Sequence, residues 1–162
     1  MGLIALIAWL TTAGAGLYLL AVWLIEYDRD FQRAAATRLP IPVLGGHALL
    51  AVAGLLTWTA YLVLDDDRLA WAAVIILGGV AVLGLTMAVR WLAVYRATPA
   101  PARLRVAHGG TGSGTGSAAV AAGRPSVPPE RNFPVTVVIV HGVCAVATVA
   151  LVLLTALGVF DT

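Results

Sequence analysis

Two histidines are the residues of this chain whose type and position could do chemistry. His47 and His141 each interrupt an apolar stretch, 41–64 and 133–160, that has no other basic or acidic side chain. An ionisable side chain inside a membrane marks a candidate functional site by default. A buried imidazole can ligate haem iron or another metal ion, relay a proton, or hydrogen-bond a neighbouring helix. These two residues are therefore where a search for function begins.

The composition around them predicts an integral membrane protein. Of the 162 residues, 60% are hydrophobic and only 11% are charged, and the mean hydropathy is +0.94. A soluble domain usually carries about 25% charged residues. This excludes a disordered chain, a disulfide scaffold and an ordinary cytosolic enzyme. Arginine supplies all ten basic side chains, which indicates a bacterial coding bias.

Four stretches are long and apolar enough to cross a bilayer, which takes about 20 residues per helix. Because lipid offers the backbone no hydrogen-bond partner, each stretch should be a helix. We therefore predict an all-α, integral membrane four-helix bundle. Its predicted parts are three helices within residues 1–96 (about 2–25, 41–64 and 69–92), a flexible cytoplasmic linker rich in Gly, Pro and Ser at 97–132, and a fourth helix at 133–160.

The arginines predict the orientation. Nine of the ten lie in the segments that join the first helix to the second and the third to the fourth. The positive-inside rule places these basic loops in the cytoplasm and both termini outside. This favours a multi-pass protein of the inner (plasma) membrane. Trp23 and Trp91 fall near the cytoplasmic boundary, where an aromatic belt is expected.

The four helices show signs of an internal duplication. Aligning His47 with His141 also aligns Pro40 with Pro134. The first and third helices share further residues at equal spacing: Gly16-Leu17, Trp23-Leu24 and Tyr27 align with Gly84-Leu85, Trp91-Leu92 and Tyr95. The pattern predicts two tandem two-helix hairpins related by a pseudo-twofold axis along the membrane normal. Such an axis would direct both histidines toward a shared centre.

One use of two facing histidines is to hold haem b, with one imidazole on each side of the iron. Gly46 and Gly142, next to the histidines, would leave room for a macrocycle, and Arg38 and Arg131 flank the spans where they could bind propionates. Directly packed helices lie 8–10 Å apart, so the two histidine helices would have to splay.

This plan resembles membrane b-type cytochrome subunits, in which four helices carry haem between two histidines. The resemblance covers the four-span layout and the two histidines. It implies a small electron-transfer subunit, with His47 and His141 as ligands of the haem iron.

Other uses of the histidines stay open. A structural zinc site needs four ligands, and the apolar spans add only Cys144. The histidines could instead hydrogen-bond across helices in a non-redox accessory or assembly subunit of a larger membrane complex. The chain shows no nucleophile–base pair, carboxylate pair or nucleotide motif, so we expect no independent catalytic activity. Its expected partners are the lipid bilayer and a protein partner or a second copy, without nucleic acid.

Overall fold

The computed structural model describes residues 1–31, 39–96 and 129–159, and no strand occurs among them. Its elements are the helices α1 (Gly2–Phe31), α2 (Ile41–Leu64), α3 (Asp67–Arg96) and α4 (Val135–Ala156), with the short 3₁₀ helix η2 (Pro129–Asn132) before α4. Each of the four α-helices contains a segment long and apolar enough to cross a membrane. The prediction of an all-α membrane four-helix bundle is confirmed. The segment 97–128, most of the predicted linker, lies outside the described residues.

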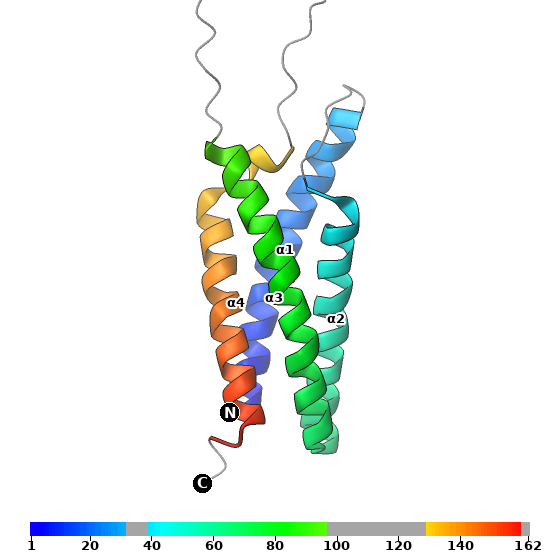
Figure 1. Cartoon of the computed structure of the whole chain (residues 1–162), viewed down its shortest axis with the longest axis vertical. Coiled ribbons are helices and arrows are strands. Elements are labelled where there is room, and N and C mark those ends of the chain that lie inside the picture. The colour runs from blue at the N-terminus through cyan, green and yellow to red at the C-terminus, as the bar shows by residue number, and fades with distance from the viewer. Residues whose placement is uncertain (32–38, 97–128, 160–162) are drawn as a thin grey trace, which may run out of the picture.

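The four helices run antiparallel to their neighbours around the bundle (Figure 1). The most extensive contacts join α2 to α3 and α1 to α4, whereas α1–α2 and α3–α4 pack less extensively. No backbone contact joins α2 to α4, so these two described helices lie diagonally across the bundle. The bundle therefore consists of two tight helix pairs that face each other. Each tight pair combines one helix from each predicted hairpin.

The two histidine helices begin in the same way. Pro40 precedes α2 with φ −65°, and Pro134 precedes α4 with φ −63°. Each proline carbonyl accepts hydrogen bonds from the backbone N–H groups three and four residues later. Proline has no N–H and a fixed φ near −65°, which suits the start of a helix. Each histidine then lies six residues after the first helical residue, about 9 Å along the helix axis.

Some helices begin or end at other residues than expected, because the expected bounds came from hydropathy alone. α1 and α3 reach Phe31 and Arg96, beyond the expected ends at 25 and 92, because helical hydrogen bonds are internal and continue past the uninterrupted apolar segment. The α2–α3 turn is short: Asp65 is left-handed, with φ 54°, and the Asp66 carboxylate accepts a hydrogen bond from the Arg68 N–H at 2.9 Å. α4 ends before Gly158, whose φ of 66° suits a residue without Cβ.

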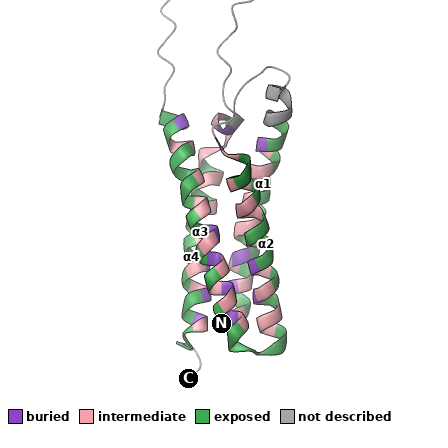
Figure 2. Ribbon diagram, turned by 45° about the vertical axis from the view of Figure 1, so that its right-hand side comes forward, coloured by how far each residue is buried: buried purple, intermediate pink, exposed green. Residues whose placement is uncertain are grey.

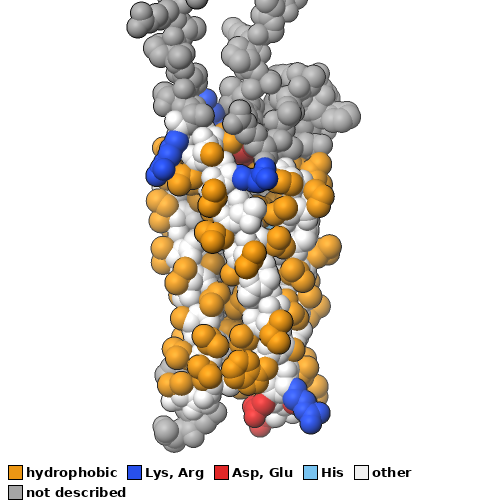
Figure 3. Space-filling model, viewed as in Figure 1, with side chains coloured by type: hydrophobic (Ala, Val, Ile, Leu, Met, Phe, Trp, Pro, Cys, Tyr) orange, Lys and Arg blue, Asp and Glu red, His pale blue; other side chains and the backbone are white. Residues whose placement is uncertain are grey.

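Charged side chains lie near the two ends of the bundle, and apolar side chains cover the surface between them (Figure 3). We call the end that carries Arg90, Arg96 and Arg131 the basic end. The opposite end holds the α2–α3 turn with Asp65, Asp66 and Asp67, and we call it the acidic end. This distribution suits a bundle that contacts lipid along its length.

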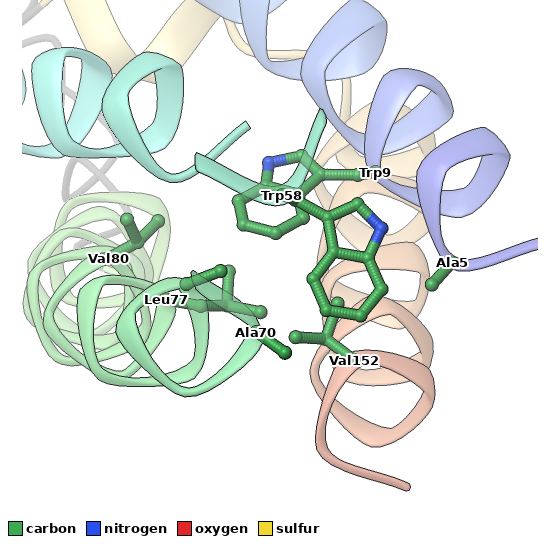
Figure 4. Packing of buried hydrophobic residues seen from close by; sticks show 8 residues of the cluster. Ala5, Trp9, Trp58, Ala70, Leu77, Val80 and Val152 are labelled. Carbon is green, nitrogen blue, oxygen red and sulfur yellow. The ribbon is translucent and has the colours of Figure 1, made fainter. Parts of the chain in front are cut away.

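A sealed core lies in the half of the bundle toward the acidic end, and Figure 4 shows its side chains from close by. Its residues are Ala5, Trp9, Trp58, Ala70, Ala73, Leu77, Val80 and Val152. Trp9 packs so closely on Gly54 that a Cβ there would lie 2.9 Å from the Trp9 Cζ2 atom. The Trp58 indole N–H donates a hydrogen bond to the Gly2 carbonyl at 3.2 Å, which satisfies its polar atom inside the protein. Two tryptophans therefore close the bundle on this side.

The section around the histidines is not sealed. Residues 10–22, 41–53, 81–93 and 135–147 include no buried side chain, although the inner faces of four packed helices are normally buried. We call these ranges the histidine section. Beyond it, Trp23, Leu39, Val94 and Glu130 are buried again at the basic end. Figure 2 shows this as buried residues in the lower half and near the upper end, with intermediate residues between.

Candidate functional site

His47 is anchored to the neighbouring helix of its tight pair. Its Nδ1 atom lies 3.0 Å from the backbone oxygen of Val80 on α3. A carbonyl oxygen only accepts hydrogen bonds, so Nδ1 carries the proton and Nε2 keeps its lone pair. Histidines that ligate metals commonly have this arrangement, because the donated hydrogen bond fixes the tautomer and the ring orientation.

His141 makes the same contact in the other tight pair. Its Nδ1 atom lies 3.0 Å from the backbone oxygen of Thr12 on α1. By the same reasoning, Nδ1 donates and Nε2 is left as an acceptor or ligand. A further hydrogen bond, 3.1 Å between the hydroxyls of Thr12 and Thr148, joins α1 to α4 one to two turns nearer the acidic end.

Each imidazole lies against a glycine of the helix that anchors it. A Cβ on Gly84 would lie 3.0 Å from the Cε1 atom of His47, and one on Gly16 would lie 3.0 Å from Cε1 of His141. Both distances are shorter than ordinary van der Waals contact. Gly16 and Gly84 therefore make room for the rings. The predicted space-making glycines do not contact the rings: a Cβ on Gly142 would meet nothing within 4 Å, and one on Gly46 would lie 3.5 Å from the Leu83 Cδ1 atom.

The structure brings the two histidines together at the centre of the bundle. Their ring centroids are 6.4 Å apart and the ring planes are inclined by 64°. With metal–imidazole bonds of about 2.0–2.1 Å, two rings that ligate one ion from opposite sides have centroids about 6 Å apart. The observed spacing is compatible with a shared ion. The backbones of α2 and α4 stay apart across the bundle, and the two imidazoles approach each other between them.

Neither Nε2 atom is sealed inside the protein. The sole buried side-chain nitrogen or oxygen that lacks a hydrogen-bond partner in the described part of the chain is Trp91 Nε1. The histidine Nε2 atoms have no hydrogen bond to a described residue either, so they must reach accessible space in the histidine section. Two anchored rings with open Nε2 atoms can accept a ligand without breaking a hydrogen bond.

The donor set suits haem better than a bare metal ion. Among residues 1–31, 39–96 and 129–159, no group of three or more His, Cys, Asp or Glu side chains could hold a metal. Cys144 is half-buried, and its backbone carbonyl accepts a hydrogen bond from the Thr148 hydroxyl. A porphyrin supplies four nitrogens itself and needs two axial ligands, whereas a structural zinc site needs four from the protein. The two histidines therefore match the number of axial ligands that haem takes from a protein.

The structure describes one of the two arginines that were predicted to bind the haem propionates. Arg131 is half-buried on η2, which packs against α1 and α3 at the basic end. Arg38 lies outside the described residues. The predicted aromatic belt is only partly realised: Trp23 is 4% exposed and faces the protein, whereas Tyr95 is 50% exposed.

The sequence reasoning missed two features of the site. These are the carbonyls of Thr12 and Val80 and the glycines that contact the rings. A signal for both was available. The same interval of 68 residues separates Thr12 from Val80 and Gly16 from Gly84, and it also separates the Trp23 and Trp91 that the alignment had paired.

The sequence matches no model of a known protein family, and no curated protein or solved structure is similar to it.

Proposed function

We propose that this membrane protein holds one haem b between His47 and His141 and serves as a small electron-transfer subunit. The observation that carries the proposal is the pair of anchored imidazoles, each with Nδ1 bound to a backbone carbonyl and Nε2 open to the same section. When bound, haem iron alternates between ferric and ferrous states and so carries a single electron. The residues of the chain would hold and orient it.

The two tight helix pairs would supply one axial ligand each. His47 stands on the α2–α3 pair and His141 on the α1–α4 pair. The sealed core closes the acidic side of the site, so a macrocycle would occupy the histidine section between the sealed core and the basic end. Exclusion of water from one side and the donated Nδ1 hydrogen bonds are the means by which a protein sets a haem potential.

The duplication of a two-helix unit belongs to this proposal. The contact of His47 with Val80 and Gly84 has its counterpart in the contact of His141 with Thr12 and Gly16, at matching intervals along the chain. A pseudo-twofold axis between the histidines would account for both. With the basic end in the cytoplasm of a bacterial cell, the haem would lie in the cytoplasmic half of the inner membrane.

The test is an absorption spectrum of the detergent-purified protein, oxidised and then reduced with dithionite, after expression with haem supplied. A strong Soret peak and a sharp reduced α-band, at one haem per chain, are expected. The variants His47→Ala and His141→Ala should each lose this spectrum, because each removes one axial ligand. His108→Ala removes the remaining histidine of the chain and is the matched control, which should keep it. A colourless wild type under these conditions would refute haem binding.

A second function is favoured by the same hydrogen bonds. Each histidine ties two helices together, which is what a packing residue in an accessory or assembly subunit would do. Interhelical hydrogen bonds in membranes contribute about 0.6 kcal/mol on average. This role predicts a colourless protein that co-purifies with a defined membrane complex. Histidine-to-alanine variants would then lower its thermal stability slightly and change no spectrum.

A further inference from the structure

The two histidines present two nitrogen lone pairs to the same section of the bundle. In each imidazole Nδ1 donates to a backbone carbonyl, so the lone pair of Nε2 is unshared. Cε1 and Nε2 are the ring atoms farthest from the helix that carries the ring. A Cβ on Gly16 would lie 3.0 Å from Cε1 of His141 but 4.0 Å from its Nε2, so Nε2 is turned away from the anchoring helix. The ring of His47 lies on Gly84 in the same way.

A bare metal ion at this place would have two protein ligands. Among residues 1–31, 39–96 and 129–159, no group of three or more His, Cys, Asp or Glu side chains could hold a metal. Structural Zn²⁺ takes four ligands, and Cu(II) prefers a square-planar or tetragonal set. Cu(I) has a filled d shell and is stable with two nitrogen ligands in a line. The number of donors therefore favours Cu(I) among the ions that imidazole binds.

The charge around the histidines favours a monovalent ion as well. The histidine section contains no Asp or Glu, and charged side chains lie near the ends of the bundle (Figure 3). Two neutral imidazoles do not offset the charge of an ion. Because the cost of burying an ion rises with the square of its charge, a divalent ion would cost about four times as much as a monovalent ion of the same size.

The spacing of the rings suits one ion between them. Their centroids are 6.4 Å apart, and two imidazoles that share an ion, with metal–nitrogen bonds of about 2.0–2.1 Å, have centroids about 6 Å apart. Linear coordination sets no condition on the angle between the ring planes, so their inclination of 64° is compatible with it. The hydrogen bonds to Val80 and Thr12 would hold both rings in place while the ion is bound.

We propose that the haem-free protein binds one Cu(I) ion between His47 and His141, with the two Nε2 atoms as its ligands in a linear site. Two copper–nitrogen bonds form, the ion arrives already reduced, and no proton leaves the protein, because both Nε2 atoms are unprotonated. This inference goes beyond the electron-transfer function proposed above and does not rest on it. Haem and Cu(I) would use the same lone pairs, so each excludes the other.

The test uses the full chain in detergent, purified from cells that cannot synthesise haem. The protein is titrated without oxygen, in the presence of ascorbate, against a coloured Cu(I) chelator whose absorbance reports the copper that the protein removes. The wild type should take up one Cu(I) per chain. His47→Ala and His141→Ala should each lose this copper, because each leaves a single ligand. His108→Ala and Cys144→Ala are the matched controls and should bind Cu(I) as the wild type does.

The other outcomes overturn the proposal or separate it from haem binding. A wild type without copper, a histidine variant that keeps it, or its loss in Cys144→Ala would each overturn the two-histidine site. Haem-saturated protein that still takes up Cu(I) would do the same. A wild type that binds haem but no Cu(I) overturns this inference alone, whereas one that binds Cu(I) but no haem refutes the proposed function alone.

A measurement on the wild type keeps the inference testable if a histidine variant does not fold. X-ray absorption at the copper edge distinguishes linear Cu(I), which gives an intense pre-edge peak, from Cu(I) with more ligands. The first shell of the loaded protein should contain two nitrogen atoms. A first shell with sulfur, or with three or more ligands, would overturn the proposed site.

Discussion

A methyl group on Gly84 should weaken haem binding through His47. In Gly84→Ala the new Cβ would lie 3.0 Å from Cε1 and 3.5 Å from Nδ1 of that imidazole. The ring would have to move by a few tenths of an ångström. Without haem it is free to rotate away, at the expense of its hydrogen bond to Val80. With haem the ring must stay in the ligating position, so the strain falls on the bound state.

The magnitude follows from the cost of overpacking. Inserting one methyl group into a well-packed contact costs about 1–3 kcal/mol, and 1.4 kcal/mol is about tenfold in affinity. We therefore expect the haem dissociation constant of Gly84→Ala to rise by about 5- to 150-fold. Titration of the apoprotein with haem, followed by the Soret absorbance, measures this directly.

The same helix offers a matched control for Gly84→Ala. A Cβ on Gly78 would meet nothing within 4 Å, so Gly78→Ala makes the same chemical change in open space and should bind haem as the wild type does. Gly16→Ala should repeat the effect through His141. Equal affinities for Gly84→Ala and Gly78→Ala, in a wild type that binds haem, would refute the view that the glycine makes room for a ligating ring.

Two further predictions concern stability and are measured by thermal unfolding in detergent. Trp58→Ala should lower the free energy of unfolding by about 3–5 kcal/mol, because it empties the sealed core. Trp71→Ala, on a half-exposed side chain, should cost far less, and equal losses would contradict the assignment of the core. Thr148→Val removes the hydroxyl that faces Thr12 and should cost about 0.6 kcal/mol. Thr11→Val is its control, since the Thr11 hydroxyl bonds only within α1. A larger loss of unfolding free energy in Thr11→Val than in Thr148→Val would count against the interhelical hydrogen bond.

The number and type of the helices were predictable because a bilayer imposes a minimum apolar length. α2 follows directly from this rule, since its apolar stretch is bounded by Pro40 and by Asp65. The two histidines were predictable because nothing else in their spans is basic or acidic. Their equal depth followed from the equal distance of each from its proline.

The inward-facing residues were harder to predict. A soluble helix shows its buried face as an apolar stripe, but a membrane helix is apolar all round and gives no such contrast. Trp9 and Trp58 therefore could not be assigned to the core from their type. The position of Trp91 in the chain indicated the interfacial boundary and gave no sign that its Nε1 atom is enclosed. Backbone carbonyls such as that of Val80 leave no trace in residue type.

The hydrogen bonds that anchor each histidine to another helix have a consequence for biosynthesis. His47 leaves the ribosome with the first two helices, yet its carbonyl partner, Val80, belongs to the third. Thr12, on α1, precedes its partner His141, on α4, by 129 residues. His47 can reach its anchored orientation only after α3 has been inserted, and His141 only after α4 has joined α1. The two anchored imidazoles therefore exist together only when all four helices have assembled, and a product truncated before α4 would lack the pair.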